Sequence, residues 1–202
     1  MPSTLVHLAV GGLVAAGLLG AAFDKRALTL CLAAAAVPDL DTFLGLWVQG
    51  GHRAMLHTLL LPVALGVGLY LAGRERTLSE TQMAVGWAAL GALVFGGIGP
   101  DLFTNGVNAF WPVHDEFVRL SGEALLSNQR GFVQTFVELQ PGGSTSVGTT
   151  ETVHYRTGVD AAAGPDPKNV ERIFPLVMSG TQLLLVLTSA VVVGGRLLDD
   201  YR

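Results

Sequence analysis

Residues 38–58 read PDLDTFLGLWVQGGHRAMLHT, and this stretch decides how the rest of the chain is interpreted. It lies between two strongly apolar runs, yet it contains Asp39, Asp41, His52, Arg53 and His57. Charged and imidazole side chains are costly in hydrocarbon, so such groups at membrane depth usually mark a site. Carboxylates and imidazoles are also ligands of divalent transition metals. The stretch therefore predicts half of a metal site at one face of a membrane.

The composition indicates an integral membrane protein. The chain has 202 residues, of which 50% are hydrophobic and only 14% charged, and its mean hydropathy is +0.49. A soluble domain usually carries about 25% charged residues. The net charge of -4 offers no basic patch to neutralise phosphates, which argues against nucleic acid as a partner. With the single cysteine Cys31, no disulfide framework is possible within one chain.

The apolar runs predict about five transmembrane helices, since a helix of about 20 residues crosses a bilayer core. The predicted helices cover residues 4–23, 27–48, 57–72, 83–103 and 173–195. Basic residues follow the first run instead of preceding it, so we expect a retained helix and not a cleaved signal peptide. The second helix is predicted to be broken, because Pro38 interrupts it and the backbone of residues 38–41 should be extended or irregular.

Residues 113–172 are polar and rich in Thr, Ser and Gly. Alternating runs at residues 131–138 and 151–157 predict β-strands, with a loop at residues 140–143 between them. The fold class is therefore mainly α, a multi-pass membrane protein with a small β-rich insertion before the last helix. The expected domains are a membrane-embedded helical core (1–112), a β-rich module outside the membrane (113–172), and the last helix with a cytoplasmic tail (173–202).

The basic residues near the span ends predict the orientation. Cytoplasmic loops of membrane proteins carry an excess of Lys and Arg. We therefore expect the following residues on the cytoplasmic side: Lys25, Arg26, Arg74, Arg76 and Arg196. The N-terminus and the β-rich module then lie outside, and the C-terminus is cytoplasmic. Separate segments bring their polar groups to the same outer level, namely His7, Asp39, Asp41, His52, His57 and Asp101. This convergence is the strongest argument from sequence for a site.

The two carboxylates of the PDLD segment allow more than one role. In extended backbone, Asp39 and Asp41 would point to the same side and could both bind a metal. Alternatively, Asp41 could only cap the N-terminus of a helix that starts at Thr42. We favour Asp39 as a ligand, with Asp41 either capping or bridging.

His52 and His57 would diverge by about 140° on one straight helix. They converge if His52 precedes the helix on the Gly50-Gly51 turn and His57 lies in the first helical turn. The guanidinium of Arg53 could bind an anionic group such as phosphate. It could alternatively contact only lipid headgroups.

Asp101 ends an apolar span, so its carboxylate needs a cation or a metal. Thr104, Asn105 and Asn108 could hydrogen-bond such ligands. His7 by itself could be a simple interhelical hydrogen-bonding residue. His114 could supply a further ligand, although a solvated loop is the expected setting for it.

Five features in order carry a family resemblance: a histidine in the first helix, PDLD, HRAMLHT, DLFTNG and a final WP. Over residues 1–111 the chain resembles membrane-bound metal-dependent hydrolases related to LexA-binding inner-membrane proteins. That family is distantly similar to zinc-dependent phospholipase C and to single-strand-specific zinc nucleases. The resemblance implies an α-helical phosphoesterase whose metal ligands are His7, Asp39, Asp41, His52, His57 and Asp101. One departure concerns the ligand set, because Gly97 stands where the family has a histidine four residues before the aspartate.

The resulting expectation is a metal-dependent hydrolase of phosphoester bonds in lipid or lipid-linked substrates at the outer face of the membrane. A divalent metal, most plausibly Zn²⁺, would be the cofactor and membrane lipid the partner. Arg53 would bind an anionic group of the substrate, and Asp41 or Asp101 would act as the base. The alternative is an inactive membrane scaffold that binds a protein partner through residues 113–172. An ion or proton carrier ranks last, because the polar residues gather at one face.

Overall fold

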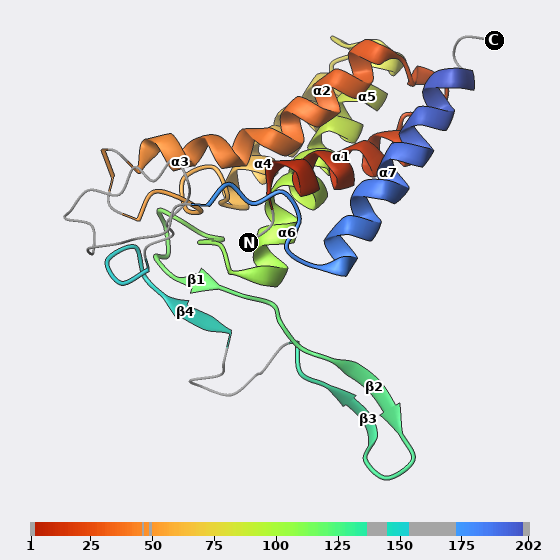
Figure 1. The fold of residues 1–202 in the computed structure, drawn as a ribbon. Coiled ribbons are helices and arrows are strands. Elements are labelled where there is room, and N and C mark those ends of the chain that lie inside the picture. The colour runs from red at the N-terminus through yellow and green to blue at the C-terminus, as the bar shows by residue number, and fades with distance from the viewer. Residues whose placement is uncertain (1–2, 46, 49, 137–144, 154–172, 200–202) are drawn as a thin grey trace.

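The structure is a computed structural model that describes residues 3–45, 47–48, 50–136, 145–153 and 173–199. Its helical elements are α1 (Thr4–Leu18), η1 (Gly20–Ala22), α2 (Lys25–Ala36), η2 (Val37–Leu40), α3 (Asp41–Leu44), α4 (Leu60–Arg74), α5 (Glu80–Gly91), η3 (Ala92–Ile98), α6 (Gly99–Thr104) and α7 (Gly180–Asp199). Its strands are β1 (Phe117–Val118), β2 (Ala124–Ser127), β3 (Gly131–Gln134) and β4 (Ser146–Gly148). The helices pack side by side in a bundle, and the strands lie beyond the end that carries α6 (Figure 1).

Helix α1 packs against α2, α7 and η3. Two glycines permit this close packing: a Cβ on Gly11 would lie 2.6 Å from Cβ of Ala35, and one on Gly12 would lie 3.1 Å from Oγ of Ser189. Small residues let helix backbones approach within a membrane, where dispersion contacts replace the hydrophobic drive. The apolar core beside α1 consists of Ala15, Leu19, Phe23, Ala27, Leu28, Cys31, Ala35, Ala88 and Ala92.

The helix lengths agree with a membrane protein. Within the part of the chain that the structure describes, three helical stretches are long and apolar enough to cross a bilayer, namely Lys25–Leu44, Glu80–Thr104 and Gly180–Asp199. Two further apolar helices, α1 and α4, are shorter, with 15 residues each. The prediction of a mainly helical membrane fold with small β elements is confirmed, whereas the structure supports three spans by length and not the full count of five.

The second span is not broken in the way that the sequence predicted. Helix α2 continues through the 3₁₀ turn η2 into α3, so Lys25–Leu44 is one helical stretch. Pro38 stands in the first turn of η2, a position where the ring fits and its missing N–H costs little. The predicted extended backbone over residues 38–41 is therefore wrong, and Asp39 and Asp41 point to different neighbours.

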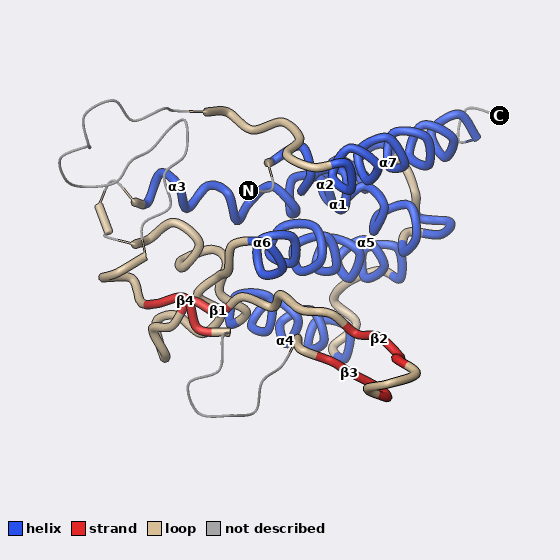
Figure 2. The backbone as a smooth tube through the Cα atoms, turned by 60° about the horizontal axis from the view of Figure 1, so that its bottom comes forward, coloured by secondary structure: helices blue, strands red, loops and turns tan. Residues whose placement is uncertain are grey.

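The fourth predicted span is also one continuous helix of changing pitch. Helix α5 passes into the π-helical segment η3 and then into α6, and Figure 2 shows α5 and α6 in line. The π-helical segment contains the buried pair Gly96 and Gly97. Such segments are rare and concentrate at functional sites.

The β elements are smaller than predicted. Strands β2 and β3 form an antiparallel hairpin that projects away from the helices, and β1 pairs with β4 (Figure 1). Strand β3 confirms residues 131–134 of the run at 131–138, whereas residues 135 and 136 are not in a strand. The loop at 140–143 lies outside the described residues. The strand predicted over 151–157 is wrong for residues 151–153, where Thr152 N–H donates to Thr149 O and closes a turn. The remainder of that run is outside the described residues.

Candidate metal centre

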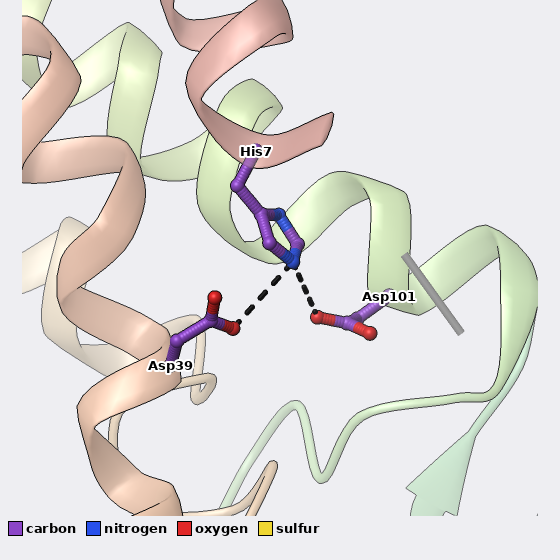
Figure 3. Close-up of side chains that lie close together, drawn as sticks. All are labelled: His7, Asp39 and Asp101. Carbon is purple, nitrogen blue, oxygen red and sulfur yellow. Dashed lines mark ion pairs between the residues drawn. The ribbon is translucent and has the colours of Figure 1, made fainter. Parts of the chain in front are cut away.

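His7 points from the second turn of α1 towards two carboxylates (Figure 3). Its Nδ1 lies 2.7 Å from the carbonyl oxygen of Gly96, to which an Nδ1–H donates. Its Nε2 then faces Asp39 Oδ1 at 3.5 Å and Asp101 Oδ2 at 3.2 Å. The imidazole is 1% exposed, so the hydrogen bond to Gly96 determines the orientation of a buried ring.

His7, Asp39 and Asp101 together form a group of potential metal donors. Each offers one ligand atom, and these atoms all lie within 4.8 Å of one another. The residues come from α1, η2 and α6, which are far apart in the chain. Asp39 is held in place by Thr4, whose Oγ1 donates to Oδ2 at 2.5 Å. One imidazole nitrogen and two carboxylate oxygens, oriented by further hydrogen bonds, are donor types that divalent cations take in proteins.

Asp41 organises a second cluster beside this donor group. It is fully buried, and its Oδ2 accepts from Arg53 N–H at 2.9 Å and from Leu56 N–H at 3.3 Å. His57 Nδ1 lies 2.9 Å from the same oxygen, and His52 Nδ1 lies 2.9 Å from Oδ1. The alternative in which Asp41 only caps a helix is wrong, because the helix already continues through residue 41 and no side-chain cap forms there. Asp41 instead folds the HRAMLHT loop around its carboxylate.

His57 connects the two clusters. Its Nδ1 faces Asp41, and its Nε2 lies 3.1 Å from Oδ2 of Asp101. A doubly protonated imidazole donates to both carboxylates in this position. The structure thus brings together all the predicted ligands, but in two groups: His7, Asp39 and Asp101 converge on one point, whereas Asp41, His52 and His57 bond with one another beside it.

Arg53 is buried against Asp101. Its Nη2 lies 2.8 Å from Oδ1 of Asp101, and the residue is only 2% exposed. This burial excludes a role confined to lipid headgroups. The backbone of Arg53 has a positive φ of 64°, which non-glycine residues rarely adopt and which tends to be kept at functional sites. An anionic group of a substrate would have to share this guanidinium with Asp101.

A short extended segment after α6 holds the HRAMLHT loop. Asn108 N–H donates to the carbonyl oxygen of Arg53 at 2.8 Å, and Leu59 N–H donates to that of Ala109 at 2.8 Å. The Thr58 hydroxyl also donates to the carbonyl oxygen of Ala109, at 3.1 Å. These bonds fix both ends of the loop that carries His57.

Of the residues expected to hydrogen-bond near Asp101, Asn105 donates its backbone N–H to the carbonyl oxygen of Asp101 at 3.0 Å, whereas the side chains of Thr104 and Asn108 are engaged elsewhere. The Thr104 hydroxyl donates to the carbonyl oxygen of Pro100 at 2.8 Å, and Asn108 Nδ2 donates to Asp115 at 2.6 Å. His114 is 64% exposed and pairs with Glu116, so it is a surface residue. It therefore lies apart from the donor group of His7, Asp39 and Asp101.

Gly97 lies where η3 packs closely against α2 and η2. A Cβ at this position would lie 2.9 Å from the carbonyl oxygen of Ala35 and 2.8 Å from Cγ of Pro38. Real Cβ atoms essentially never approach so closely, so η3 packs against α2 and η2 only because residue 97 has no side chain. A larger side chain at position 97 would therefore displace the neighbouring helical segments.

Sequence reasoning missed two contributors to the site, Thr4 and the carbonyl oxygen of Gly96. Thr4 precedes His7 by three residues, a spacing that places both on one helix face and could have indicated the pairing. A backbone carbonyl has no signature in the sequence, so the role of Gly96 could not be found in that way.

Comparison with known proteins assigns the family. The family described as YdjM inner membrane protein matches residues 1–162, which include the helical core, the whole site and much of the β-rich segment. No curated protein and no solved structure gives a significant match. The family and the apolar helices together make this a membrane protein. The chain belongs to the YdjM inner membrane protein family.

Proposed function

We propose that this protein is a membrane-embedded, metal-dependent hydrolase of phosphoester bonds in lipid or lipid-linked substrates. One observation carries the proposal: donor atoms of His7, Asp39 and Asp101 from three helices lie within 4.8 Å of one another. Buried carboxylates and imidazoles at the end of membrane helices are costly unless a cation or a reaction needs them. Membership of an inner membrane protein family supports the setting but not the reaction.

The proposal includes five crossings, with the N-terminus and the site outside and the C-terminus in the cytoplasm. Helices α1 and α4, at 15 residues, reach about 22 Å each, somewhat less than the hydrocarbon core of about 30 Å. Adjoining turns extend them, since η1 follows α1 directly and the HRAMLHT loop precedes α4. The distribution of Lys and Arg supports the direction of each crossing.

A zinc ion bound by His7, Asp39 and Asp101 would acidify a coordinated water and polarise a phosphoryl oxygen. The protein's own residues would then position and accept protons. Asp101 is held by the buried Arg53 and by His57, which in turn is held by Asp41. When His57 carries one proton, the hydrogen-bonded series Asp101, His57 and Asp41 would pass a proton away from the reacting centre, and the doubly protonated imidazole would hold it between the two carboxylates.

Elemental analysis of the purified protein tests the proposal. We expect zinc in stoichiometric amount in the wild type and in His114→Ala, which removes a surface histidine outside the donor group. Asp39→Ala should lose both the zinc and the hydrolysis of phospholipid substrates. A wild type that stays metal-free after incubation with zinc would contradict the proposal.

The packing at Gly97 favours a second candidate, an inactive scaffold that binds a protein partner through residues 113–172. Without room for the family histidine, the donor group has lost a ligand that the resemblance implies. A wild type that binds zinc but hydrolyses no lipid phosphoester would favour this candidate over the hydrolase.

A further inference from the structure

A groove with a volume of about 480 Å³ lies between α2, α4 and the helix formed by α5 and η3. Its lining is almost entirely apolar. On α4 it is lined by Leu61, Leu65 and Leu69, which recur every four residues and therefore lie on one helix face. On the opposite side it is lined by Gly86 of α5 and Ala34 of α2.

The length of the groove corresponds to one membrane leaflet. From Leu61 to Leu69 the helix rises by about 12 Å, close to half of the hydrocarbon core of about 30 Å. The far end is narrow, because a Cβ on Gly86 would lie 2.8 Å from Cδ1 of Leu69. The groove thus runs from the level of the polar site towards the middle of the membrane.

The near end of the groove borders the HRAMLHT loop that Asp41 holds. Leu56 lines the groove, while its backbone N–H donates to the carboxylate of Asp41 at 3.3 Å. Val37 lines the same end and stands two residues before Asp39. A single molecule could therefore place an apolar chain along α4 and a polar group at the donor atoms.

We propose that this groove binds one acyl chain of a membrane lipid and so presents the headgroup phosphoester to the metal centre. The inference rests on the proposed function and specifies its substrate class as a lipid with an acyl chain. An apolar groove rejects the headgroup itself, because a polar group buried there would lose its hydrogen bonds. A helix from a second protein does not fit, since a cylinder of about 10 Å diameter and 12 Å length occupies roughly 900 Å³. The volume is within the range of about 300–1,000 Å³ that small-molecule sites have.

Photo-crosslinking in phospholipid vesicles tests the orientation of the chain. Two phosphatidylglycerol probes carry a diazirine, one near the carboxyl end of the acyl chain and the other at its methyl end. The first probe should label peptides that contain Leu56 and Leu61, and the second should label those that contain Leu69 and Gly86. Equal labelling of both regions by both probes, or labelling spread evenly over the exposed face of α7, would show bulk lipid only and overturn the proposal.

Groove-filling variants supply the control. Ala34→Phe and Ala89→Phe place a ring in the groove and should each reduce this labelling at least fivefold. Ala33→Phe adds the same ring on the exposed side of α2, the helix that also contains Ala34, and should leave the labelling unchanged. Retained labelling in both groove variants would overturn the proposal, and using two of them guards against one that fails to fold.

Zinc content, measured on the same samples, separates this inference from the proposed function. Zinc bound to the wild type and to all three variants, with oriented labelling lost only in the groove variants, supports both. Zinc bound without oriented labelling overturns the acyl-chain groove and leaves the metal centre. Oriented labelling in a protein that binds no zinc supports the groove as a lipid site and contradicts the hydrolase.

Discussion

Gly97 shows how the absence of one Cβ atom determines the packing beside the site. The helix that carries Asp101 touches α2 and η2 at this residue, and the missing Cβ allows the backbones to approach. The same contact places Asp101 beside His7 and Asp39. At the residue scale, the absence of a side chain at position 97 therefore permits the close packing of η3 against α2 and η2.

Gly97→Ala should destabilise the protein by about 1–3 kcal/mol, since overpacking a tight interior typically costs that much. Gly68→Ala is the matched control, because nothing lies within 4 Å of a Cβ added there. That change should be neutral or slightly stabilising, because alanine is the better helix former. Thermal unfolding in detergent compares the two variants, and equal melting temperatures would contradict the close packing at Gly97.

The buried pair of Arg53 and Asp101 leads to a second prediction at this scale. Arg53→Met leaves Asp101 without its guanidinium partner, and breaking a buried ion pair from one side costs about 3–5 kcal/mol. Arg74→Met at the exposed end of α4 should change stability by less than about 0.5 kcal/mol. The free energies of unfolding of the two variants and the wild type, measured in a denaturant series, test this difference. Arg53→Met with the stability of Arg74→Met would argue against the buried pair.

At the scale of elements, the turn after β4 is joined to the site through Asp115. The Asp115 carboxylate accepts from Asn108 Nδ2 at 2.6 Å and from the Thr150 hydroxyl at 2.6 Å. The backbone of Thr150 also packs closely against Gly50, whose positive φ of 65° suits a glycine. The part of the β-rich segment around β4 is therefore attached to both segments that frame the site.

This attachment should depend on pH. Partial burial would raise the pKa of Asp115, but hydrogen bonds from Thr150 and Asn108 lower it below the ordinary value of about 4. The carboxylate therefore contributes stability above about pH 4, and this contribution is lost as the pH falls through the lowered pKa. As the pH falls below about 4 and Asp115 becomes protonated, the Thr150 amide should lose protection, so its hydrogen exchange should become faster relative to the intrinsic rate at each pH. Asp115→Asn should show weaker protection and no such step, and an identical step in this variant would exclude Asp115 as its source.

At the scale of the whole molecule, the proposed orientation places the β2–β3 hairpin outside and the loop between α4 and α5 in the cytoplasm. The chain has a single cysteine, the buried Cys31, which can be replaced by alanine for labelling experiments. In that background, a membrane-impermeant maleimide added to intact cells should modify Ser127→Cys in the hairpin. It should not modify Thr77→Cys until the membrane is opened. The opposite pattern would reverse the orientation.

The sequence by itself determined the class of the protein and the residues of its buried polar cluster. Long apolar runs require a membrane, and any Asp, His or Arg within them is conspicuous because hydrocarbon penalises it. His7, Asp39, Asp41, Arg53, His57 and Asp101 could be predicted as one polar cluster for this reason. The weak strands after residue 113 were harder to predict, because short two-stranded pairings depend on partners that no periodicity reveals.

Only the tertiary structure decided how the cluster divides. Because the chain stays helical through Pro38, each residue turns by about 100–120°, and Asp39 and Asp41 face different neighbours instead of one metal. Asp39 meets His7 and Asp101, while Asp41 holds His52 and His57. Whether a carboxylate becomes a metal donor or a hydrogen-bond acceptor for a loop depends on such angles and on the helices that pack opposite, and neither can be read from residue types.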